Sequence, residues 1–182
     1  REIEKLIRDY RRILRELSEK IRRLAEEHED IVRKLIETLK RLIDEIRKIM
    51  EDLSRLLRRD GSTEELRKRA RKSLEDLRRK IREIKKRLEE EHKKTRKKVK
   101  ELEDEAREKT KELEKRLKDA NVPKKLMDEL RRVSEEVNTR LEKLLRDLEK
   151  KLRDSEERAK ELIRRIEKTL EDIDRRLKEE EK

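Results

Sequence analysis

Residues 117–130, LKDANVPKKLMDEL, hold the only proline of the 182-residue chain and decide how two long helices are joined. Asn121 suits the left-handed conformation that caps the C-terminus of a helix. Pro123 suits the first turn of the next helix, because the N–H group that proline lacks has no partner in that turn. The stretch therefore predicts that one helix ends and another begins within a few residues.

The only glycine lies in RRDGSTEEL, residues 58–66, and predicts a second joint. Gly61 suits the left-handed residue that ends a helix, and Ser62 with Glu65 matches a capping box that begins another. The predicted elements are a helix at about 2–59, a turn at 60–62, a helix at about 63–119, a turn at 120–122 and a helix at about 123–180. Because connections this short make neighbouring helices antiparallel, we expect one all-α domain over residues 1–182, a single-chain up-down-up bundle of three long helices.

The composition is typical of long helices, since 60% of the residues are Asp, Glu, Lys or Arg and the single aromatic residue is Tyr10. Cysteine is absent, which excludes disulfides and Cys-ligated zinc and leaves the redox compartment open. No stretch approaches the ~18 apolar residues of a membrane span, and no apolar leader opens the chain. We expect a soluble protein without a targeting signal or natural compartment, made by recombinant expression in the cytoplasm.

The apolar residues repeat every 18 positions, as in the row Leu6, Leu24 and Leu42. Eighteen residues make five turns at about 3.6 residues per turn, whereas a heptad repeat imposes about 3.5 and a left-handed supercoil. The helices are therefore predicted to be nearly straight. Folding the chain at its joints matches the first two helices at residue numbers that add to 123 or 124, and the first and third helices at an offset near 120.

The stretch EEEHKKTRKKVK, residues 89–100, is predicted to have two faces. Helical spacing turns His92 and Thr95 toward the core and the lysines toward solvent. A buried polar group without a partner costs about 1 to 3 kcal/mol, so inward polar residues are expected to pair. The first predicted hydrogen-bond network contains His28, His92, Thr95 and Ser155, and the second contains Tyr10, Ser18, Thr110, Ser134 and Asn138. Such layers fix helix register. In the alternative interpretation, these are polar residues tolerated near the rim of the core.

Metal binding and catalysis are not predicted. Glu89 and His92 match the Glu-x-x-His spacing of di-metal bundles, but such a site needs a second pair, and Ala25 stands three residues before His28. The serines are scattered and no glycine-rich loop is present to hold a phosphate. We therefore expect no enzyme activity, metal or cofactor. A further hypothesis is acid sensitivity, since a buried neutral imidazole opposes protonation.

The net charge of +12 lies mainly on residues 61–120. Within them, residues 93–100 form a basic run of the kind that binds nucleic acid or anionic lipid. The run has no aromatic residue to stack on a base, and acidic residues alternate with cations along the rest of the chain. We therefore expect neither a specific nucleic-acid partner nor a membrane partner, and we expect a monomer that requires no partner.

The chain resembles de novo designed helical bundles over its whole length. The features that carry the resemblance are the 18-residue rows of Leu and Ile, the Glu, Lys and Arg surface, the absence of Cys and Trp, the joints at Gly61, Ser62, Asn121 and Pro123, and the polar insertions His28, His92, Thr95, Thr110 and Ser134. Designs of this family include bundles with planned buried hydrogen-bond networks and single-chain cages that release a helix. The resemblance implies no functional site.

The predicted function is that of a designed structural scaffold, without natural enzymatic or ligand-binding activity. The alternative is a switch, in which the helix at 123–180 is a latch displaced by a competing helix. A weaker alternative is a basic protein that binds nucleic acid or a membrane surface. Spectrin-like repeats are similar in topology, but they usually hold aromatic residues in the core, which this chain lacks.

Overall fold

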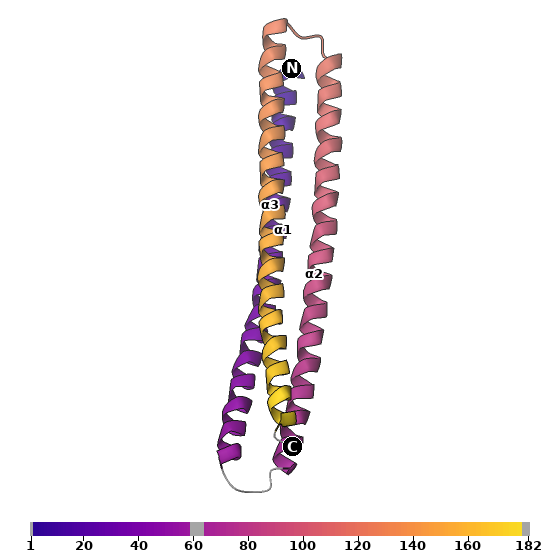
Figure 1. Cartoon of the computed structure of the whole chain (residues 1–182). Helices are drawn as coiled ribbons and strands as arrows, with labels where there is room; N and C mark the ends of the chain where they lie inside the picture. The colour runs from indigo at the N-terminus through magenta and orange to yellow at the C-terminus, as the bar shows by residue number, and fades with distance from the viewer. Residues whose placement is uncertain (1, 59–63, 180–182) are drawn as a thin grey trace. The chain divides into compact units, whose positions relative to one another are not determined.

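The chain folds into three α-helices, which Figure 1 shows in order along the chain. The computed structural model describes residues 2–58 and 64–179, including all of their side chains except those of 56–58 and 179. Helix α1 spans Glu2–Arg58, α2 spans Glu64–Asp119 and α3 spans Lys124–Glu179. No strand occurs among the described residues. The prediction of an all-α fold is confirmed.

The three helices group into two compact units. Unit 1 consists of Arg1–Glu29 and His92–Asp154, and unit 2 consists of Asp30–Glu91 and Ser155–Lys182. Each unit therefore contains one stretch of every helix and has its own core.

The joint between α2 and α3 is a tight turn centred on Asn121. The N–H of Ala120 donates the last bond of α2, to Arg116 O at 3.0 Å, and the N–H of Val122 donates to Ala120 O at 3.0 Å. A bond between residues two apart makes a γ-turn, and because no described residue has a positive φ, the turn is of the inverse type. The prediction of a left-handed Asn121 is wrong. Pro123 restricts the residue before it, Val122, to an extended conformation, and the inverse turn at Asn121 leads the chain into that conformation.

Helix α3 begins immediately after Pro123. The carbonyl oxygen of Pro123 accepts hydrogen bonds from the N–H groups of Leu126, at 3.0 Å, and Met127, at 3.1 Å. The carbonyl group of Pro123 is thus the first hydrogen-bond acceptor of α3. The N–H group that proline lacks is not needed at this position. The other predicted joint residues, Gly61 and Ser62, lie outside the described residues.

In unit 1, α1 and α2 are antiparallel. The ion pairs that join them are Asp9 with Arg116 at 2.7 Å, Glu16 with Lys109 at 3.7 Å and Lys20 with Glu105 at 2.8 Å. The two residue numbers of every pair add to 125, which requires that one helix run up as the other runs down. These flanking pairs lie one or two positions from the predicted register of 123 or 124.

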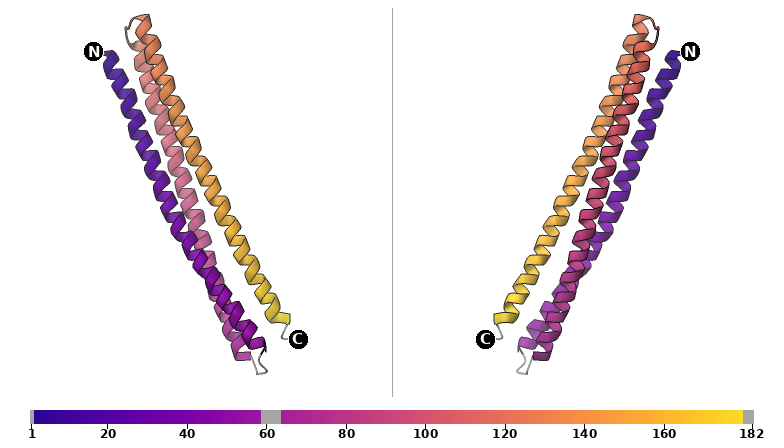
Figure 2. Two further views of the ribbon diagram at one scale, coloured as in Figure 1. Left: turned by 90° about the vertical axis from the view of Figure 1, so that its left-hand side faces the viewer. Right: turned by 90° about the vertical axis from the view of Figure 1, so that its right-hand side faces the viewer.

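Helices α2 and α3 are also antiparallel in each unit. In unit 2, Arg78 pairs with Asp174, and Lys85 Nζ lies 3.7 Å from an oxygen of Glu167, so the residue numbers add to 252. In unit 1, the two views of Figure 2 show α2 and α3 running side by side away from their joint. The up-down-up order of a three-helix bundle is therefore present.

Aliphatic side chains fill both cores. Apart from Tyr10 and Thr95 in unit 1, the largest side chains with almost no exposure are aliphatic: Leu17 and Leu130 in unit 1, and Leu39, Leu74, Ile81, Ile166, Leu170 and Ile173 in unit 2. The predicted row Leu6, Leu24 and Leu42 is buried throughout. The predicted row of residues 13, 31 and 49 is not fully buried, because it lies at the edge of the apolar stripe of α1. Residues 13 and 49 are half-buried, and Ile31 is 38% exposed.

Candidate functional site

The first group of predicted polar residues lies mostly in the core of unit 1. His28, Thr95 and His92 are at most 5% exposed, whereas Ser155 is half-buried and belongs to unit 2. The rings of His28 and His92, predicted to lie a layer apart, are in contact, with centroids 5.1 Å apart and planes inclined by 81°. The Nε2 atoms of both rings are buried.

Helical spacing explains why these side chains face inward. On α2, His92 and Thr95 stand on the same face as the buried Val99 and Leu102, at intervals of three and four residues. An edge-to-face contact sets the positive rim of one ring against the negative face of the other and contributes about 0.5 to 1.5 kcal/mol. The pair therefore links α1 to α2 through a contact that aliphatic residues cannot reproduce.

The second group of predicted residues is also in unit 1, but its members are not joined as expected. Tyr10 is fully buried and Ser134 is 5% exposed, while Ser18, Thr110 and Asn138 are half-buried. The Thr110 hydroxyl donates within its own helix, toward the carbonyl oxygens of residues 106 and 107 at 2.8 and 3.0 Å. Thr110 therefore does not form the predicted bond between helices, because its own backbone offers a nearer acceptor.

Tyr10 carries a buried hydroxyl on α1. Burial raises the pKa of Tyr10, because the charged phenolate loses hydration, and the hydroxyl of Ser134 on α3 acts in the opposite direction. The Tyr10 oxygen nevertheless has no partner at hydrogen-bond geometry. The hydroxyls of Tyr10 on α1 and Ser134 on α3 therefore lie near each other without a hydrogen bond between them.

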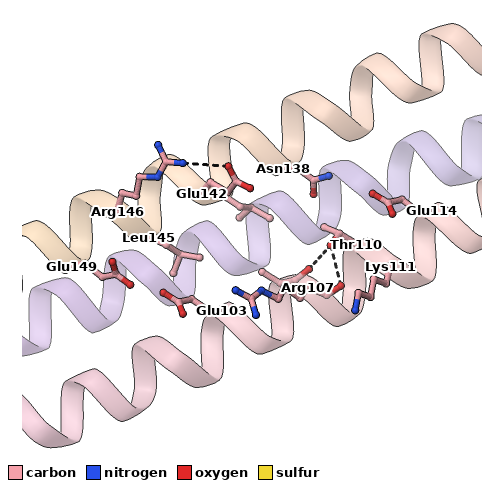
Figure 3. Close-up of a pocket in the computed structure, with 12 residues that line it drawn as sticks. Glu103, Arg107, Thr110, Lys111, Glu114, Asn138, Glu142, Leu145, Arg146 and Glu149 are labelled. Carbon is pink, nitrogen blue, oxygen red and sulfur yellow. Dashed lines mark hydrogen bonds and ion pairs between the residues drawn. The ribbon is translucent and has the colours of Figure 1, made fainter.

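A groove between α2 and α3 of unit 1 was not predicted (Figure 3). Its volume is about 420 Å³, and its apolar floor contains Ala106, Leu141 and Leu145. Glu103 of α2 and Glu149 of α3 lie together at one end of it. The neighbouring Glu149 carboxyl raises the pKa of Glu103, and partial burial raises it further.

The two glutamates occupy the same register as the ion pairs of unit 2, because their residue numbers also add to 252. Opposite charges meet at that register in unit 2 and like charges meet in unit 1. On its own helix, Arg107 lowers the pKa of Glu103 and Asp104 raises it, both more weakly than Glu149 does. Facing residues of the antiparallel helices α2 and α3 have numbers that add to 252. A search of the sequence for glutamates related in this way would have found Glu103 and Glu149.

On the flank of α2 that faces α1, acidic residues are paired with basic ones. Glu105 accepts hydrogen bonds from Lys20 at 2.8 Å and forms an ion pair with Lys109 at 2.9 Å, and these two cations lower the pKa of Glu105. The Arg116 guanidinium lowers the pKa of Asp9 in the same way. The α1–α2 flank is therefore held by opposite charges, in contrast to the α2–α3 groove.

Metal-ligating side chains do not gather in threes anywhere in the described part of the chain. None of the described helices combines the length and the apolarity that a membrane span needs. The chemistry available at the polar core is hydrogen bonding and ring contact between helices.

No known protein family matches the sequence, and no curated protein matches it. A solved structure described as a "Computationally designed three helix bundle" is similar, with a TM-score of 0.52 and 23% sequence identity over 98% of this chain and 85% of that one. The chain is a three-helix bundle. At this identity the likeness concerns the fold, and it agrees with the resemblance of the bundle to designed proteins.

Replacing Glu103 with glutamine is expected to stabilise the bundle at pH 7 by less than about 1 kcal/mol, because it removes a like charge from a partly exposed pair. The raised pKa means that folded Glu103 binds its proton more tightly than the unfolded chain does. The stabilisation from that proton is present below the ordinary pKa of glutamate and is lost as pH rises through the raised value. Urea midpoints at pH 7 and near pH 4 measure the effect, which should shrink at the lower pH.

Glu101 is the matched control, since it is exposed on the same helix and lies outside the groove. Glu101→Gln should leave the urea midpoint unchanged at both pH values. Equal shifts from the two substitutions would show that net charge, rather than contact between Glu103 and Glu149, determines the effect.

Proposed function

We propose that the bundle is a designed structural scaffold whose buried polar residues fix how its helices align. The observation that carries the proposal is their distribution. Among the described residues, the buried polar side chains are His28, His92, Thr95 and Ser134, and all belong to unit 1, whereas the buried core of unit 2 is aliphatic.

The physical argument rests on how each core responds to a shift of one helix. A slip by one turn moves a helix about 5.4 Å along its axis. In a repeating aliphatic core, such a slip sets one Leu or Ile against another. In unit 1 the same slip would separate the rings of His28 and His92 and bury polar atoms against aliphatic carbon, at about 1 to 3 kcal/mol for each lost hydrogen bond. The polar residues therefore favour one register over its neighbours.

The alternative function, a latch formed by α3, has less support. Leu130, Ile166 and Leu170 of α3 are at most 2% exposed, like the most buried residues of α1 and α2. A helix that is released easily would be expected to bury less apolar surface than the helices that hold it.

An all-apolar variant tests the scaffold proposal: His28→Leu, His92→Leu, Thr95→Val and Ser134→Ala. We expect it to stay helical and equally or more stable, because buried polar groups that are replaced together by apolar ones of similar size are often neutral or stabilising. We also expect it to lose uniqueness, which two-dimensional NMR would detect as more than one set of amide signals.

The matched control exchanges four hydroxyls outside the buried core: Thr38→Val, Thr139→Val, Ser155→Ala and Thr169→Val. Each of these residues is exposed or half-buried. The control should keep a single set of signals. A single set in the all-apolar variant as well would remove the proposed role of the polar core.

A further inference from the structure

The outer face of α2 in unit 1 carries a row of cations. We name it the basic stripe, and it consists of Lys93, Lys97, Lys100, Arg107, Lys111, Lys115 and Lys118, all exposed. Intervals of three, four and seven residues place them on one side of the helix, opposite the buried Thr95, Leu102 and Leu113. By the same spacing, Asp104 is the acidic residue that lies within the row.

The cations of the basic stripe have few charge contacts with the rest of the chain, the clearest being that of Arg107, which lowers the pKa of Glu103 in the neighbouring groove. No residue of the stripe forms an ion pair with a described carboxylate, whereas Lys109 and Arg116, on the flank toward α1, are both paired. On α1 and α3, by contrast, exposed arginines form ion pairs with acidic residues of the same helix. On α1, Arg22 pairs with both Glu19 and Glu26, and on α3 arginines pair with acids four residues away.

The length and charge of the stripe match one kind of partner. From Lys93 to Lys118 it spans roughly 37 Å, at about 1.5 Å per residue, which is close to one turn of a nucleic-acid duplex at about 34–36 Å. A duplex carries a negative charge about every 1.7 Å and releases counterions when lysines replace them. We propose that the basic stripe binds the phosphate backbone of double-stranded nucleic acid without reading its sequence.

The side chains present favour phosphate contact over other modes of binding. The single aromatic residue, Tyr10, is buried in the core, so no ring is available to stack on the bases of a single strand. Six of the seven cations are lysines, which act as point charges rather than as the bidentate donors that distinguish bases. No apolar residue belongs to the stripe, so it offers nothing to insert among lipid tails.

Fluorescence anisotropy of the full chain with a labelled duplex of about two helical turns tests the proposal. Non-specific binding of this kind has dissociation constants of about 10⁻⁴ to 10⁻⁶ M at physiological salt. Between about 50 and 200 mM salt, the logarithm of the affinity should fall linearly with the logarithm of the salt concentration, with a slope of about −4.5 to −6.3 for five to seven phosphate contacts. Duplexes of unrelated sequence should bind equally.

Two variants of equal net charge locate the contact. The stripe variant changes the six lysines of the basic stripe to glutamine, and the control changes six other exposed lysines, Lys124, Lys125, Lys143, Lys150, Lys151 and Lys160. The stripe variant should lose at least about tenfold in affinity near 50 mM salt and have a shallower salt slope, since each lost phosphate contact lowers the slope by about 1. The control should stay within about threefold of the parent, and circular dichroism should show equal helicity for both.

Three results would overturn the proposal. The first is no binding of duplex at about 50 mM salt. The second is an equal loss of affinity in both variants, since that would assign binding to net charge. The third is binding of heparin or of anionic vesicles under conditions in which duplex does not bind, since the partner would then be another polyanion.

Discussion

Changing Leu17 to alanine is expected to lower the free energy of unfolding by about 2 to 5 kcal/mol. Leu17 is completely buried, and truncation removes its apolar contacts and leaves a cavity in unit 1. Its core cluster includes Ala106 and Val137, whose short side chains cannot move far enough to fill the space. Urea unfolding followed by circular dichroism measures the change as a shift of the midpoint.

Leu14 is the matched control, three residues earlier on the same helix and half-buried. Leu14→Ala should cost clearly less, because its side chain keeps part of its exposure to water in the folded bundle. If the two truncations cost the same, the close packing around Leu17 described above would be incorrect.

The second large effect is expected from Tyr10→Phe, which should raise the free energy of unfolding at neutral pH by about 1 to 3 kcal/mol. The substitution keeps the buried ring and removes a hydroxyl whose oxygen has no partner at hydrogen-bond geometry. Chemical denaturation of both proteins at pH 7 gives the difference. A loss of stability would mean that contact between Tyr10 and Ser134 contributes more than the geometry indicates.

The same residue makes the bundle sensitive to alkali. The pKa of Tyr10 is raised by burial, so the stability that depends on its neutral form is complete below about pH 10 and is lost as pH rises through the raised value. Because no other tyrosine or tryptophan is present, tyrosinate absorbance reports this residue alone. Its appearance should coincide with loss of helicity, and Tyr10→Phe should unfold at higher pH. Ionisation near pH 10 without loss of helix would contradict the burial of Tyr10.

The fold could be predicted because the sequence contains few competing signals. One glycine, one proline and apolar rows of constant period leave three helices as the consistent solution. The conformation of Asn121 could not be predicted from residue preference, since an asparagine that follows a helix can form an inverse γ-turn instead of the left-handed conformation. The exposure of Ile31 could not be predicted either, because it depends on which face of α1 meets the neighbouring helices.

The sequence predicted the burial of some polar residues better than their hydrogen bonds, and the predicted members Ser18, Thr110, Asn138 and Ser155 are only half-buried. Helical spacing indicated that His28, His92 and Thr95 point inward, and they are buried. Which hydrogen bonds form depends on distances of tenths of an ångström, and the Thr110 hydroxyl bonds its own backbone for that reason. The basic stripe was recognised only up to residue 100, because the acidic residues interleaved beyond it in sequence lie mainly on other faces of α2.

The aliphatic core of unit 2 has a consequence for re-engineering the molecule. An insertion of 18 residues, five complete turns, returns every later side chain to its original direction. Adding one such module to each helix within unit 2 would lengthen each by roughly 27 Å without creating a new kind of core layer. The helix period would then set the increments by which the helices of unit 2 can be lengthened, while the polar core of unit 1 keeps its pattern.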